Sequence, residues 1–76
     1  MPEIAPGIEV SPDRCSGRPV IRNTRVPVKT VLDALAAGDT LEQVATDYGI
    51  THDDIRNAIA FANTLVDEWE FVPTRG

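Results

Sequence analysis

Two helix-start signals placed eleven residues apart constrain the fold of this chain more than any other feature. Thr40 is followed three residues later by Gln43, which makes a capping box, and Thr51 is followed at the same distance by Asp54. A carboxylate at the third helical position also suits the positive end of the helix dipole. Gly49 interrupts the chain between the two signals. The spacing predicts two short helices joined by a tight turn.

Three segments between residues 28 and 62 each place their apolar residues on one face of a helix. Between residues 28 and 36 they follow the spacing i, i+3, i+4, i+7 and i+8, and Gly38 supplies a stop. Two further stripes flank Gly49. The predicted core faces are Val28, Val31, Leu32, Leu35 and Ala36; Leu41, Val44, Ala45 and Tyr48; and Ile55, Ala58, Ile59 and Ala62. The last helix is expected either to run on toward Trp69 or to break near Asn63.

The second and third of these helices match a helix-turn-helix, in which a small residue such as Ala45 lets the helices approach closely. If the unit docks on DNA, outward residues near the start of its second helix meet base edges. The outward set is Thr51, His52, Asp53, Arg56, Asn57 and Ala60, and its candidate DNA-binding members are Thr51, His52, Arg56 and Asn57. Asp53 and Asp54 would approach phosphates unfavourably, so a helix that does not read DNA is the alternative.

The N-terminal third is extended in character. A short alternating run covers Ile8 to Val10, and two β-prone runs flank Asn23, which tolerates the left-handed backbone of a tight turn. Pro27 cannot donate to a neighbouring strand, so the second run must end there or lie at an edge. We therefore expect a mostly α fold, with a short N-terminal β-hairpin followed by a three-helix, homeodomain-like helix-turn-helix bundle.

Charge is segregated along the chain, whose formal net charge is −5. Residues 1–13 carry −3 and residues 30–76 carry −7, whereas residues 14–29, the basic ribbon, carry +5 and no acidic side chain. Because phosphate contacts supply most non-specific affinity for nucleic acid, only the basic ribbon could grip a polyanion. Its candidate partner-binding residues are Arg18, Arg22 and Arg25.

Structural roles compete with these assignments. Arg25 could instead fix the hairpin onto the helices through a carboxylate such as Asp33 or Asp47. Trp69 and Phe71 are candidate anchors for a protein partner, and they could equally close the core or a homodimer seam.

Seventy-six residues predict one domain, with a β-ribbon over 8–28, a three-helix unit over 28–63 and a C-terminal extension over 64–76. A chain this short buries only about 60% of the surface that its unfolded form exposes, so a homodimer or another partner is expected. No apolar run reaches the roughly 20 residues of a membrane span, and no secretory signal is visible. These features predict a soluble, cytoplasmic protein.

Neither catalysis nor a metal or cofactor is expected. Cys15 has no base-like neighbour and is interpreted as an ordinary thiol. His52 lacks an activated nucleophile and an orienting partner. The acidic run over residues 67–70 has no His or Cys at ligand spacing, which favours a solvated face.

From Ile8 to Ala62 the chain resembles the small prokaryotic family known as domain of unknown function 433. The family pattern Gly-x-Pro-x-Ile-x-Gly-Thr-Arg-[Ile/Val]-x-Val is matched at Gly17, Pro19, Ile21, Thr24, Arg25, Val26 and Val28. Asn23 stands where the family usually has Gly, and Asn is the next-best residue for a turn of positive φ. Gly49 stands where relatives often carry Pro, and it makes the turn similar to that of ordinary DNA-binding proteins.

The resemblance implies a fold similar to VapB-type antitoxins, which are often paired with a PIN-like nuclease toxin and can repress their own operon. Such nucleases hold metal ions with clustered carboxylates, which arginines of the basic ribbon could engage by bidentate contacts. Alternatively, the ribbon grips operator DNA and the toxin is held by "LVDEWEFV". A different class of function, a protein-only interaction module that uses the helix-turn-helix as a scaffold, is favoured by Asp53 and Asp54.

Overall fold

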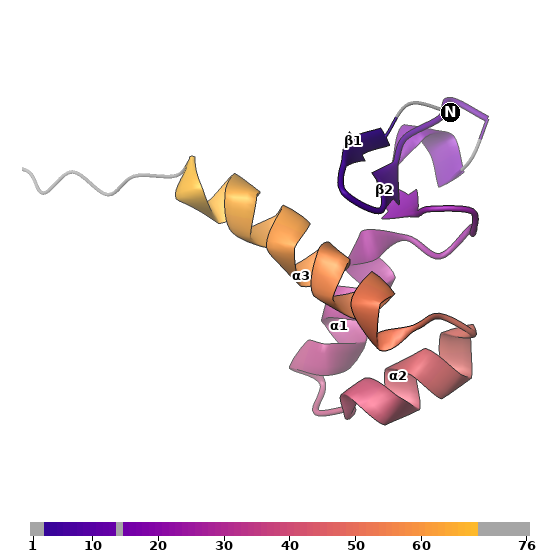
Figure 1. Cartoon of the computed structure of the whole chain (residues 1–76), viewed down its shortest axis with the longest axis vertical. Helices are drawn as coiled ribbons and strands as arrows, with labels where there is room; N and C mark the ends of the chain where they lie inside the picture. The colour runs from indigo at the N-terminus through magenta and orange to yellow at the C-terminus, as the bar shows by residue number, and fades with distance from the viewer. Residues whose placement is uncertain (1–2, 14, 69–76) are drawn as a thin grey trace, which may run out of the picture.

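The computed structural model describes residues 3–13 and 15–68, which form a small antiparallel sheet followed by three helices (Figure 1). The predicted fold class is confirmed. The elements in chain order are β1 (Glu3–Ala5), β2 (Ile8–Glu9), the 3-10 segment η1 (Cys15–Gly17), β3 (Val20–Ile21), α1 (Val28–Ala36), α2 (Leu41–Tyr48) and α3 (His52–Asp67).

The sheet has the strand order β1-β2-β3, and both neighbouring pairs are antiparallel. It begins at Glu3 rather than at residue 8, because β1 adds an exposed edge strand that no alternation in the sequence marks. The expected hairpin around Asn23 forms only in part. Its first run is β3, whereas its second is reduced to an isolated bridge between Val20 and Pro27, as expected where a proline cannot donate.

Asn23 adopts the left-handed conformation predicted for it, with φ of 62°. The Thr24 hydroxyl donates to the carbonyl of Ile21 at 2.7 Å and accepts from the backbone N–H of Val26 at 3.0 Å. The N–H of Ile21 donates in turn to the carbonyl of Val26 at 2.9 Å. The turn is therefore closed by its own side chain and backbone.

Both helix-start signals are confirmed. Thr40 accepts from the N–H of Gln43 at 3.1 Å, and the Gln43 side chain accepts from the N–H of Thr40 at 2.8 Å. Thr51 and Asp54 make the same reciprocal pair, at 3.0 Å in each direction. Gly49, with φ of 67°, ends α2 in the left-handed conformation. Local sequence is sufficient here because each cap involves residues only three apart.

The core takes the inner part of each predicted stripe and residues from the sheet. Its buried members are Ile8, Ile21, Val28, Val31, Val44, Ile50, Ile55 and Ala58, with Leu32, Leu35, Ala45 and Phe61 packed against them. The outer members were placed wrongly: Ala36 is exposed, and Leu41, Tyr48 and Ile59 are 36%, 39% and 44% exposed. A core this small does not reach the ends of the helical faces.

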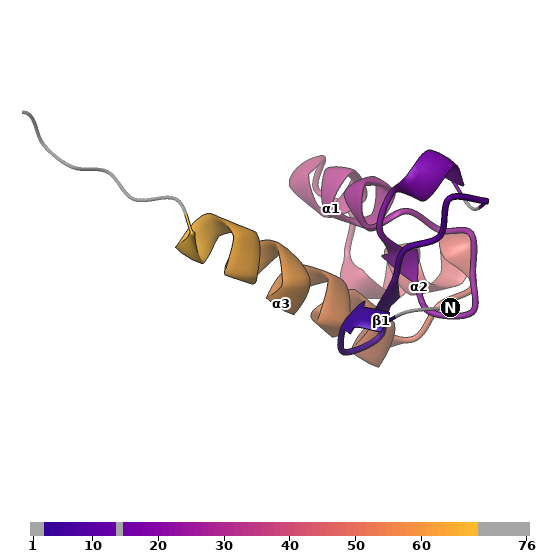
Figure 2. The same ribbon diagram turned by 90° about the horizontal axis from the view of Figure 1, so that it is seen from above.

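α3 continues to Asp67 with no break at Asn63, so residues 64–67, assigned to the C-terminal extension, belong to the helix. Its C-terminal half projects away from the sheet and from α1 and α2 in two perpendicular views (Figures 1 and 2). Trp69 and Phe71 lie outside the described residues.

Candidate macromolecular interface

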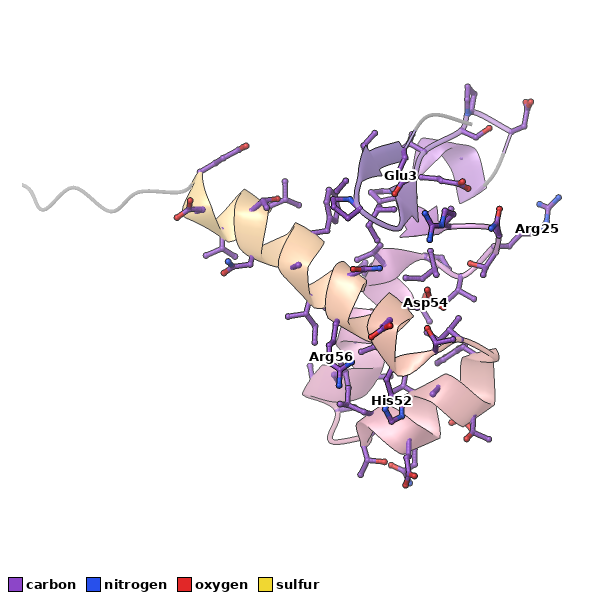
Figure 3. The ribbon with its side chains drawn as sticks, viewed as in Figure 1. Glu3, Arg25, His52, Asp54 and Arg56 are labelled. Carbon is purple, nitrogen blue, oxygen red and sulfur yellow. The ribbon has the colours of Figure 1, made fainter. Side chains whose placement is uncertain are left out.

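The start of α3 presents three of the four residues predicted to contact DNA. Thr51, His52 and Arg56 are exposed, and Figure 3 shows His52 and Arg56 along the first turns of the helix. The Thr51 hydroxyl is engaged as the helix cap. Arg56 Nη1 lies 2.9 Å from Asp53 Oδ1, with side-chain exposures of 64% and 86%. An exposed pair of this kind contributes little stability, so a competing anion can replace it.

Asn57 does not belong to this outward surface. It is half-buried, and a Cβ added at Gly7 would lie 2.4 Å from Asn57 Nδ2, which places the Asn57 side chain directly against the turn between β1 and β2. The prediction that Asn57 points outward was wrong because β1 and its turn, which cover this part of α3, were not anticipated.

The arginines of the basic ribbon are distributed around the sheet. Arg22 Nη1 lies 3.5 Å from Glu3 Oε2, with side-chain exposures of 51% and 38%. The same Glu3 oxygen accepts from the N–H of Gly7. Arg25 is exposed and extends outward from the turn (Figure 3), whereas Arg18 lies by the groove described below. The ribbon therefore presents guanidinium groups in several directions.

In the alternative prediction, Arg25 fixes the hairpin onto the helices through a carboxylate such as Asp33 or Asp47. Both Asp33 carboxylate oxygens accept from Lys29 Nζ, at 3.2 and 3.0 Å. This pair joins residues one helical turn apart on α1, and both side chains are exposed. Asp33 is thus engaged by a cation of its own helix.

Glu9 is a residue of the site that sequence reasoning missed. It is 7% exposed, and its Oε1 accepts from the backbone N–H of Asn23 at 3.3 Å. Alternation predicts that Glu9 faces solvent opposite Ile8, yet both residues of β2 are buried. The available signal was a charged residue inside a short β-prone run. When such a carboxylate is buried, it requires a hydrogen-bond donor, here a backbone N–H.

An apolar groove of about 480 Å³ separates the ribbon and α1 from the second half of α3. Its lining is Pro19, Pro27, Val28, Leu32, Phe61, Ala62 and Leu65, with Arg18, Lys29 and Asp33 as its charged members. The residues described by the structure contain no cluster of His, Cys, Asp or Glu arranged to hold a metal ion. Among those residues, no helix combines the length and apolarity needed to cross a membrane.

The fold and the capped turn between α2 and α3 define a helix-turn-helix domain with an N-terminal β-structure. Residues 8–62 match the family model described as "Protein of unknown function (DUF433)", and the chain belongs to this family. A crystal structure of a DUF433 member protein from Anabaena variabilis superposes with a TM-score of 0.73 at 28% identity, covering 82% of this chain and 62% of that one.

This chain is also similar to proteins from Mycobacterium tuberculosis. A protein named "Putative antitoxin VapB45" is 42% identical over 52 residues, which cover 68% of this chain and 22% of the relative. The crystal structure of Rv2018 has a TM-score of 0.64 at 42% identity, covering 68% of this chain and 24% of that one. The chain therefore spans less than a quarter of the length of these relatives.

Proposed function

We propose that this chain is the antitoxin of a toxin–antitoxin pair, a cytoplasmic, non-enzymatic regulator that binds and silences a PIN-like nuclease. The observation that carries the proposal is the 42% identity to a relative named as an antitoxin. That likeness covers 68% of the chain.

The basic ribbon is the proposed surface for the toxin. Arg22 and Arg25 flank a turn that is fixed by Asn23, Thr24 and the buried Glu9. A fixed turn avoids the cost of ordering its backbone on binding, and its guanidinium groups can pair bidentately with clustered carboxylates. In this proposal they occupy the carboxylates that the nuclease uses for metal ions, while Trp69 and Phe71 supply anchors beyond the described residues.

The test measures inhibition of the nuclease encoded by the neighbouring reading frame. Arg25→Ala should weaken inhibition by roughly tenfold or more, because a charge-assisted contact is worth about 1.5–3 kcal/mol. Arg56→Ala is the matched control, since it removes an exposed arginine from a different surface and should leave inhibition intact. Failure of the wild-type chain to inhibit the nuclease sinks the antitoxin proposal, and equal effects of the two variants sink the ribbon's part in it.

We also propose that the chain binds operator DNA as a repressor through Thr51, His52 and Arg56. A gel-shift assay on the upstream operator, run at several salt concentrations, tests this. Arg56→Ala should weaken specific binding by about 1–3 kcal/mol if Arg56 reads a base. Unchanged affinity would remove Arg56 from the contact set.

A protein-only interaction module is the second candidate. It is favoured by the acidic start of α3, where Asp54 caps the helix and Asp53 engages Arg56, and by the covering of Asn57. Absence of any specific shift, with or without the toxin, would leave only this function.

Two copies are expected to act together. A homodimer presents its two helix-turn-helix units to the halves of a palindromic operator, and it adds buried surface to a chain with a small core. Sedimentation of the purified chain measures this directly.

A further inference from the structure

The end of α3 extends past the core against which the helix packs. α3 has 16 residues, about 24 Å at 1.5 Å per residue, yet its buried residues, Ile55 and Ala58, lie in its first half. Every residue from 63 to 68 is exposed. This end projects from the body in both views of the ribbon (Figures 1 and 2).

The apolar stripe of α3 nevertheless continues along this end. Leu65 follows Phe61 by four residues and Ala58 by seven, and Val66 follows Ala62 by four. Leu65 and Val66 therefore lie on the same face of α3 that packs against the core in the first half of the helix. Leu65 and Val66 are 53% and 63% exposed. Adjacent exposed side chains with core spacing indicate a helix that packs against another macromolecule.

The groove beside α3 offers a surface that fits this helix end. Its lining is apolar, with Leu32 and Phe61 facing the same space as Leu65. Arg18, Lys29 and Asp33 line it as well. Lys29 pairs with Asp33, whereas no described residue forms an ion pair with Arg18. The exposed end of α3 carries the opposite charge, on Asp67 and Glu68.

We propose that two copies of this chain pair through these surfaces, with their α3 helices antiparallel across a two-fold axis. The Leu65 side chain of each copy enters the groove of the other, beside Leu32 and Phe61, and the acidic helix end faces Arg18. Phe61 and Leu65 belong both to the inserted helix and to the receiving groove, so the surface is self-complementary, as a two-fold interface requires. This inference rests on the homodimer of the proposed function and assigns its surface.

Sedimentation equilibrium of the full chain over a wide range of concentrations, without toxin or DNA, tests the pairing. The wild type should show a reversible monomer–dimer equilibrium. Leu65→Asp should raise the dissociation constant on the order of a hundredfold, because symmetry places the charge twice in the seam. Asn63→Asp is the matched control: it adds the same charge to the same helix end at an exposed, already polar position and should leave the constant unchanged.

A wild-type chain that stays monomeric, or a dimer that Leu65→Asp leaves intact, overturns the pairing. If Leu65→Asp fails to fold by circular dichroism, Arg18→Glu decides. A rise in the dissociation constant of about tenfold at low salt supports the seam, and no change overturns it.

The nuclease assay separates these outcomes from the proposed function. A monomer that still inhibits the toxin overturns the seam and leaves the antitoxin assignment standing. A dimer that is broken by Leu65→Asp but never inhibits the toxin supports the seam and removes the antitoxin assignment.

Discussion

The turn around Asn23 and the start of α3 are both polar, exposed parts of the proposed interface, but different interactions hold them in shape. At the start of α3, Thr51 bonds Asp54 and Asp53 pairs with Arg56, all within three residues. At the turn, the local hydrogen bonds of Thr24 are joined by one from the Asn23 N–H to Glu9, which is 14 residues away in sequence. The helix start is therefore determined locally, whereas the turn also depends on the sheet, so the two can be perturbed separately.

The largest effect should come from Gly7, in the turn between β1 and β2, where the β-structure packs against Asn57 of α3. Gly7→Ala forces a side chain into a backbone with φ of 73° and places its Cβ against Asn57. The left-handed conformation costs roughly 1–2 kcal/mol and the crowding a further 1–3 kcal/mol, so we expect a loss of about 2–5 kcal/mol in the free energy of unfolding.

Urea denaturation of Gly7→Ala, Asn57→Ala and the double variant separates the two costs. The double variant should recover most of the crowding part, since only the Asn57 Cβ, 3.2 Å from the added Cβ, remains. It should keep the backbone part, which gives a favourable coupling between the two positions. Additive losses would show that Asn57 does not confine Gly7.

Glu9→Ala should destabilise the turn around Asn23 without changing the start of α3. Loss of a buried acceptor leaves the Asn23 N–H without this partner and costs about 1–3 kcal/mol. Glu9→Gln keeps a side-chain oxygen and should cost less.

Amide hydrogen exchange locates the effect of the Glu9 substitution. Protection should fall at Asn23 in Glu9→Ala and stay unchanged at Ile55, inside α3. Equal losses at both amides would mean that the sheet and the helices unfold as one unit.

Thr51→Ala tests the start of α3, which is held by interactions within one helical turn. Removal of the cap on α3 should lower stability by about 0.5–2 kcal/mol. Thermal unfolding monitored by circular dichroism measures the loss, and Thr51→Ser, which retains the hydroxyl, is the control. A loss as large in Thr51→Ser would point to the methyl group rather than to the cap.

Glu3→Gln should have the smallest effect. The Glu3–Arg22 pair is 38% and 51% exposed at 3.5 Å, and a solvent-screened pair of this kind contributes at most about 1 kcal/mol. The amide oxygen of Gln can still accept from Gly7. The change in the urea midpoint should shrink further at high salt. A salt-independent loss would assign the contribution to the Gly7 hydrogen bond instead.

Sequence alone determined the features of this protein that depend on neighbours along the chain. The capping boxes at Thr40 and Thr51, the left-handed Asn23 and the left-handed Gly49 could all be predicted, because each rests on residues within one helical turn or on the conformational freedom of one residue.

Tertiary structure decided what depends on segments far apart. It buried Glu9 beneath the turn, added β1, covered Asn57 and carried α3 past the core with its apolar stripe exposed. Periodicity shows which face of an element is apolar but not what packs on that face or where the packing stops. Long-range contacts between the β-structure and the helices set those limits, and a local pattern contains no information about them.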